Sequence, residues 1–143
     1  MRLMSQGQLD NALTAVRQEI GISKDPRARL VEVRILLAQK KSDEALKSVQ
    51  AALQAEPNNP DYIYLKGAVE MSLQRLSSAE QDLRKALQLS PRHTGAMNDL
   101  AVLLMTVNKK AEAKSLLEQV LKINPQDQMA AANLERLNSE AQQ

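Results

Sequence analysis

Ser90 and His93 are the two side chains whose types and spacing come closest to a catalytic pair. A serine hydroxyl beside an imidazole could act as a nucleophile with its general base, but that chemistry needs a third group that orients the ring. The segment Ser90-Pro91-Arg92-His93-Thr94-Gly95 supplies no such group and has the composition of a loop. We therefore expect His93 to be an exposed loop histidine and the chain to contain no catalytic residue.

Metal and cofactor chemistry lack the residues that they require. His93 is the only histidine and there is no cysteine, which excludes disulfides, thiolate zinc sites and cysteine nucleophiles. The four glycines do not have the spacing of a phosphate-binding loop, so a nucleotide-binding fold is not expected. We predict no metal and no cofactor, and the composition argues against an enzyme of any familiar kind.

Charge and hydropathy indicate a protein that works in water. Lys and Arg number 19 against 17 Asp and Glu, and the resulting net charge of +2 is too small to indicate a nucleic acid or an anionic membrane as partner. No apolar run is long enough to span a bilayer. The opening Met1-Arg2-Leu3-Met4 turns polar at once, unlike a signal peptide. We expect a soluble cytoplasmic or periplasmic protein, with no membrane insertion and no signal segment in this chain.

A period of 34 residues organises the chain, because apolar residues and prolines recur at that step. The recurring sets are Ala45, Ala79 and Ala113; Val49, Leu83 and Leu117; Leu53, Leu87 and Leu121; and Pro57, Pro91 and Pro125. Ala12, Val16 and Ile20 continue the pattern toward the N-terminus at a step of 33. This regularity indicates a tandem array.

Each unit is expected to fold as two helices. In its second half, apolar residues recur at the three- and four-residue spacing of a buried helix face. Alanine at the recurring positions suits a close helix crossing, and the prolines end each unit. The helices are expected at roughly residues 8–20, 26–40, 42–55, 60–74, 76–89, 93–107, 110–123 and 127–140.

These recurring residues resemble the tetratricopeptide repeat (TPR) family, whose unit is a 34-residue helix–turn–helix. With positions numbered 1–34, the alanines of the first set stand at position 20, the prolines at position 32 and Gly67 at the small position 8. The chain departs from the family pattern with Glu32 and Lys66 at position 7 and Glu70 at position 11. The resemblance implies an all-α fold, a right-handed superhelical solenoid, and a bacterial TPR protein or a fragment of one.

One TPR domain is expected over residues 1–143. It divides into a partial N-terminal repeat (1–25), three repeats (26–59, 60–93 and 94–127) and a C-terminal capping helix (128–143).

The resemblance also implies a partner site, because the first helices of successive TPR units line a groove that receives a protein or peptide segment. Carried onto this sequence, the groove would be lined by Arg27, Arg34, Tyr64, Met71, Asn98, Asp99, Met105, Asn133 and Arg136. Tyr64 and the methionines suit recognition, and Asn98 and Asn133 could hold a peptide backbone. Leu30, Leu65 and Val102 occupy further lining positions that core residues could equally fill.

One function known in the family, the binding of acidic chaperone tails, is not expected for this chain. TPR co-chaperones that bind acidic chaperone tails use Lys, Asn and Arg at defined groove positions. The corresponding residues in this sequence are Leu30, Arg34, Leu65, Gly95 and Asp99. Asp99 would repel a carboxylate, so we reject binding of an acidic tail.

The two ends of the array lead to an alternative function. Leu9, Leu13 and Val16 form a helix side for which the sequence shows no partner, which indicates a fragment of a longer repeat protein or an oligomer joined there. At the other end Met129, Ala132, Leu134 and Leu137 are expected to face inward. We expect a non-catalytic adaptor or scaffold; the alternative is an assembly segment of a bacterial envelope machine (pilus, secretion or polysaccharide export) that acts through its N-terminal helix.

Overall fold

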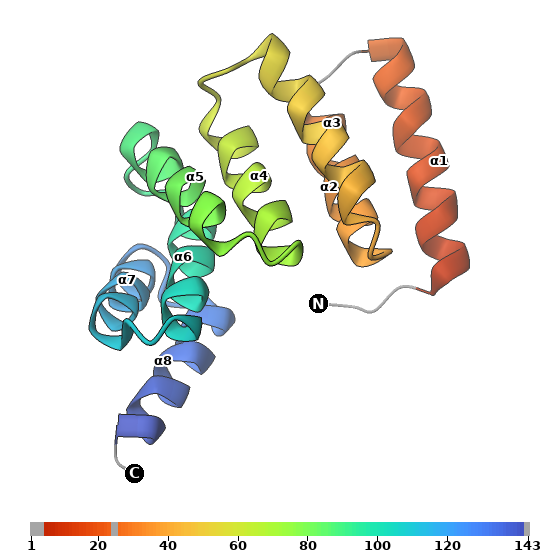
Figure 1. The fold of residues 1–143 in the computed structure, drawn as a ribbon. Helices are drawn as coiled ribbons and strands as arrows, with labels where there is room; N and C mark the ends of the chain where they lie inside the picture. Colours follow the sequence, from red (N-terminus) through yellow and green to blue (C-terminus); the bar gives the residue numbers. More distant parts are fainter. Residues whose placement is uncertain (1–4, 24–25, 142–143) are drawn as a thin grey trace.

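The computed structural model describes residues 5–23 and 26–141, and within them the chain forms eight helices and no strand (Figure 1). The helices are α1 (Gln6–Ser23), α2 (Pro26–Ala38), α3 (Ser42–Ala55), α4 (Pro60–Ser72), α5 (Leu76–Leu89), α6 (Thr94–Thr106), α7 (Lys110–Ile123) and α8 (Gln128–Ala141). Each helix begins and ends within a few residues of its expected range. The prediction of an all-α fold is confirmed.

The helices stack in chain order, with α1 and α8 at opposite ends of the array (Figure 1). Helices α2, α4, α6 and α8 also contact one another in succession. Among the described residues, no such contact joins α3 to α5 or α5 to α7. We call the first set the inner helices and α3, α5 and α7 the outer helices. Because successive inner helices contact each other whereas successive outer helices in the described residues do not, the inner helices form the tighter, concave side of the superhelix.

The turn from each inner helix to its outer helix contains one residue with positive φ. Lys40, Gln74 and Asn108 have φ angles of 62°, 62° and 65° and lie 34 residues apart. In each turn the next backbone N–H donates back to a carbonyl near the end of the inner helix, as from Arg75 to Glu70 at 2.8 Å. This is the hydrogen bond of a Schellman C-cap, a conformation that favours glycine.

The recurring alanines lie where helices cross most closely. Ala45, Ala79 and Ala113 are completely buried, as the sequence pattern predicted. Gly67 on α4 faces α5 so closely that a Cβ built on it would lie 3.0 Å from the Leu83 side chain. Small residues at these positions therefore set the separation of inner and outer helices.

Of the charged residues that depart from the family pattern, Glu32 and Glu70 are buried and Lys66 is partly buried, and each has a charged or polar partner. Glu32 on α2 accepts a hydrogen bond from Ser48 on α3 and pairs with Arg17 on α1, whose Nε lies 3.2 Å away. One repeat later, Lys66 stands in the place of Glu32 and Asp82 in the place of Ser48. The Lys66 Nζ lies 3.3 Å from the carboxylate of Asp82. Positions 7 and 23 of a repeat thus face each other, and a polar residue at one is matched at the other.

Lys66 also forms an ion pair with Glu70, the third residue that departs from the family pattern. The Lys66 Nζ lies 3.4 Å from Oε1 of Glu70, one helical turn further along α4. Burial, together with the neighbouring Asp82, raises the pKa of Glu70 to about 7, against a lowering by Lys66. This carboxyl group therefore changes charge near neutral pH.

The expectation of an apolar, unpartnered side on the N-terminal helix is wrong. Leu9, Leu13 and Val16 are buried in one cluster with Val33 and Leu36 of α2. Over residues 6–18, for which burial is described, the exposed side of α1 is mainly polar and includes Gln8, Asn11, Thr14 and Gln18. The apolar side of this helix has its partner within the chain, because α2 covers it.

The inward side of α8 also differs from expectation. Met129 is 54% exposed and Ala132 is exposed, whereas Ala130 and Leu137 are buried and Leu134 is partly buried. The helix is rotated so that position 3 of the repeat pattern faces inward. Ala28 and Ala96 occupy the same position in earlier repeats and are also buried, which is the sequence signal that could have fixed this rotation.

Candidate partner-binding groove

The residues predicted to line the groove all lie on the inner helices but differ in accessibility. Arg27, Arg34 and Arg136 are exposed; Tyr64, Met71, Asp99, Met105 and Asn133 are partly buried; and Asn98 is buried. The accessible members therefore place positive charge on α2 and α8. The centre, on α4 and α6, is more apolar and carries Asp99.

Tyr64 occupies the middle of this surface, between α4 and the beginning of α6. Its ring centroid lies 4.8 Å from that of His93, with the two rings inclined at 45°. A Cβ on Gly95 would lie 3.1 Å from the Tyr64 ring, so glycine at this position lets the ring approach α6. Burial, together with the carboxylates of Asp99 and Asp61, raises the pKa of Tyr64 to about 12, against a lowering by Arg34.

His93 is not the exposed loop residue that the sequence suggested. It caps α6: its Nδ1 accepts the backbone N–H of Ala96 at 3.0 Å, and its Nε2 donates to Oδ1 of Asp61 at 2.9 Å. Asp61 is an orienting group that the sequence analysis did not find. Because both ring nitrogens are engaged, neither can take a proton from the Ser90 hydroxyl in this arrangement.

The capping position could have been found from the repeat. Asn59, His93 and Asp127 lie 34 residues apart and cap α4, α6 and α8, respectively. In each case a side-chain atom accepts a backbone N–H of the first helical turn. A polar residue at position 34 is therefore part of the structural pattern of this chain.

Asn98 does not have the role expected for it. Its Nδ2 donates to Oδ2 of Asp127 at 3.1 Å, and the same carboxylate accepts the N–H of Ala130 through Oδ1. The side chain thereby fixes α8 against α6 and is buried. It is not available to hold the backbone of a bound peptide.

Asp99 differs from Glu32, Asp61 and Glu70, the paired carboxylates of the inner helices α2 and α4. It lies one residue after Asn98, is partly buried, and forms no side-chain hydrogen bond or ion pair with any residue that the structure describes. Burial raises its pKa to about 6, against a smaller lowering by His93. At neutral pH this position presents a poorly solvated negative charge.

Comparison with known proteins decides the family. Two sequence profiles described as the tetratricopeptide repeat match the chain, one over residues 70–137 and the other over residues 1–60 and 30–94. The chain belongs to the tetratricopeptide repeat family. DnaJ homolog subfamily C member 3 of Mus musculus is 29% identical over 132 residues, which cover 86% of this chain and 26% of that protein. The TPR chain thus spans about a quarter of the length of this relative.

Solved structures show the same fold. The first TPR of Spaghetti (RPAP3), bound to the HSP90 peptide SRMEEVD, superposes with a TM-score of 0.76 at 23% identity and covers 85% of this chain and 98% of its own. The structure from the functional characterization of Pseudomonas aeruginosa PilF gives a TM-score of 0.79 at 20% identity and covers 96% of this chain and 63% of its own. At these identities the likeness shows the fold alone.

Two apolar residues of the TPR surface were missed by the sequence analysis. Val31 on α2 is 46% exposed and stands at position 6, the same position as Asp99. Met129 on α8 is exposed and stands at position 2, the same position as Arg27. Leu65, also at position 6, is buried and belongs to the core. One position of the repeat can thus be exposed in one unit and buried in the next.

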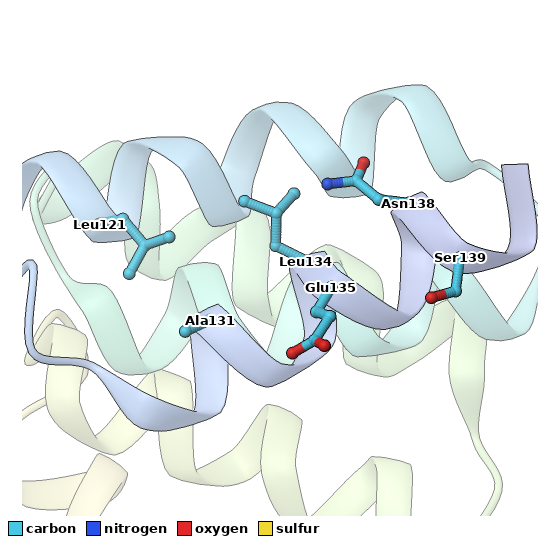
Figure 2. Close-up of a pocket in the computed structure, with 6 residues that line it drawn as sticks. All are labelled: Leu121, Ala131, Leu134, Glu135, Asn138 and Ser139. Atoms are coloured by element: carbon cyan, nitrogen blue, oxygen red, sulfur yellow. The ribbon is translucent and has the colours of Figure 1, made fainter. Parts of the chain in front are cut away.

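A hollow also lies outside the groove surface. Figure 2 shows this hollow of about 460 Å³ between α7 and α8, lined by Leu121, Ala131, Leu134, Glu135, Asn138 and Ser139. Within the described part of the chain, no three acidic or histidine side chains are placed to hold a metal ion. No helix in that part is both long enough and apolar enough to cross a membrane.

Proposed function

We propose that this TPR chain is a non-catalytic adaptor that binds a segment of a partner protein along its inner helices. The observation that carries the proposal is the accessible surface around Tyr64. A half-buried aromatic ring, backed by His93, is accompanied by partly exposed Met71 and Met105 and by exposed Arg34 on the neighbouring helix. Rigid aromatic side chains and arginine are the residue types that dominate protein-binding energies.

The scaffold supports this role because its inner surface is already ordered. Each inner helix is capped at its N-terminus or packed against its neighbours, so a partner segment loses conformational freedom without a comparable loss in the chain that binds it. The RPAP3 domain of similar fold is described with a bound peptide, which is consistent with a protein ligand here.

An assembly role through α1 has less support. The residues that suggested it, Leu13 and Val16 among them, are buried against α2, and the exposed side of α1 is mainly polar. Because the two side chains are buried, substituting them would change the stability of the fold and would not test an interface.

The test is affinity capture followed by mapping of the captured segment. Partners are captured on the immobilised chain from a lysate, and the binding segment is then synthesised and titrated by fluorescence anisotropy. Tyr64→Ala should weaken its affinity about 30-fold, corresponding to roughly 2 kcal/mol for loss of a buried aromatic anchor. Arg34→Glu, at an exposed position, should also weaken binding without loss of helicity.

The matched control is Lys85→Glu, which makes the same change of charge at an exposed position of the outer helix α5. It should leave the affinity unchanged. A segment that binds equally well to the Tyr64→Ala and Arg34→Glu variants would overturn the proposal. Loss of binding only in an Asn11→Lys/Gln18→Lys variant, on the exposed side of α1, would favour the assembly role instead.

A further inference from the structure

Several carboxylates in the described part of the chain are satisfied by hydrogen-bond partners. Asp61 accepts a hydrogen bond from His93, Asp127 from Asn98 and a backbone N–H, and Glu112 forms two hydrogen bonds with Arg84. Asp99 has no such partner among the described residues, although it is partly buried on the concave side. Burial raises the pKa of Asp99, because no hydrogen bond or ion pair within the described residues offsets the loss of water around its charge.

The surroundings of Asp99 favour a positively charged ligand. The Tyr64 ring on α4 packs so closely on Gly95 that a Cβ there would lie 3.1 Å from it. Asp99 follows Gly95 by one turn on the same side of α6, so the carboxylate and the aromatic ring share this part of the inner surface, and Asp99 raises the pKa of the Tyr64 phenol. An ammonium or guanidinium group can pair with the carboxylate and also lie against the ring. Asp61, at the beginning of α4, adds a second negative charge near the ring.

The neighbouring positions leave Asp99 open along its own helix. Gly95 lies one turn before it and Val102 about one turn after it, on the same side of α6. Neither residue carries a long or charged side chain that could pair with the carboxylate. Arg34 on α2 acts on Tyr64 but is not among the groups that shift the pKa of Asp99.

We propose that the partner segment places a lysine or arginine side chain in the centre of the groove, paired with Asp99 beside Tyr64. This inference rests on the proposed function, that the groove holds a protein segment, and names the chemistry that the segment must carry. The acidic peptide SRMEEVD bound to the RPAP3 domain has the opposite charge and would be repelled by Asp99. The exposed arginines on α2 and α8 leave the two ends of the groove free for neutral or acidic neighbours of the central cation.

The experiment uses four pools of nonapeptides in which the central residue is fixed as Lys, Arg, Gln or Glu and the others vary. Retention of each pool is measured on the immobilised wild-type chain at pH 7.5. The Lys and Arg pools should be retained about tenfold or more above the Gln pool, as expected for a hydrogen bond between charged groups, and the Glu pool least. The preference should fall with added salt.

Asp99→Asn tests the residue itself. The substitution preserves shape and removes a poorly solvated charge, so the variant should be as stable as wild type or more so, and its Lys and Arg pools should fall to the level of the Gln pool. Glu118→Gln, which makes the same change at an exposed position of the outer helix α7, should leave the preference intact.

Two outcomes would overturn the proposal. One is a Lys and Arg preference that persists in Asp99→Asn, or an equal or better retention of the Glu pool. If Tyr64→Ala still abolishes retention in that case, the groove function stands and only the cation assignment fails. The other outcome is no retention of any pool above a blank support, in which case the proposed function fails together with the cation assignment.

Discussion

His93 joins two successive inner helices through Asp61. Its Nε2 lies 2.9 Å from Oδ1 of Asp61 near the start of α4, while its Nδ1 accepts the N–H of Ala96 at the start of α6. One imidazole thus completes the first turn of α6 and connects it to α4. The same ring backs Tyr64, so the position of the groove anchor depends on this link.

Substitutions of His93 should therefore distinguish the stability contributed by its capping of α6 from that contributed by its hydrogen bond to Asp61. His93→Ala removes both and should lower the free energy of unfolding by about 1–2 kcal/mol, the usual cost of a lost N-cap. His93→Asn keeps a side-chain acceptor for Ala96 and should recover most of that loss. The measurement is urea denaturation followed by circular dichroism; equal stabilities of the two variants would show that the cap contributes nothing.

Ala79→Leu should destabilise the chain by overpacking. Ala79 is completely buried on α5, and its carbonyl oxygen lies 3.4 Å from the place of a Cβ on Gly67, which marks the close crossing of α4 and α5. Insertion of three further carbon atoms should cost about 1–3 kcal/mol. Ser77→Leu, at an exposed position of the same helix, is the control and should melt close to wild type.

Gln74→Gly should stabilise the chain. Gln74 has a φ of 62°, a conformation that costs an L-residue with a Cβ more than it costs glycine. The expected gain is about 0.5–1 kcal/mol after allowance for the greater freedom of glycine in the unfolded chain. Gln81→Gly, on the exposed side of α5, should instead lose about 1 kcal/mol. A thermal melt of both variants distinguishes the turn from the helix interior.

Stability should fall as the pH rises from about 4 to about 7 because of two desolvated acids, Asp99 and Glu70. Burial raises the pKa of Asp99 to about 6 and that of Glu70 to about 7, both above the ordinary values of 3.8 and 4.5. An acid whose pKa is higher in the folded chain than in the unfolded chain stabilises the fold when the pH is below its unfolded pKa. This stabilisation is lost as the pH rises through the folded pKa. Each group should account for a loss of about 1–3 kcal/mol in the free energy of unfolding across this pH range.

Two variants assign this pH dependence to its residues. Asp99→Asn should remove the part of the fall that lies between its ordinary pKa of 3.8 and about 6, and Glu70→Gln the part between 4.5 and about 7. The quantity to compare is the difference in unfolding free energy between wild type and variant at each pH, measured in urea. A difference that does not change between about pH 4 and about pH 7 would mean that the group is not desolvated in the folded chain.

The sequence by itself determined the helices, the repeat and the close crossings. Helix formation and the period of 34 depend on residues that are near one another in the chain, and the completely buried Ala45, Ala79 and Ala113 follow directly from that period. Asn59 as the cap of α4 could likewise be predicted, because its partner, the N–H of Asp61, is two residues away.

Only the tertiary structure decided which polar residues remain free for a partner. Asn98 is used by Asp127, 29 residues later, and His93 by Asp61, 32 residues earlier; no local pattern contains these contacts. The same limit explains why Leu13 was expected to be exposed: its partner, α2, covers it from the next unit. In a stack of repeats each surface is completed by the neighbouring unit, so burial and charge pairing at one position depend on residues a full repeat away.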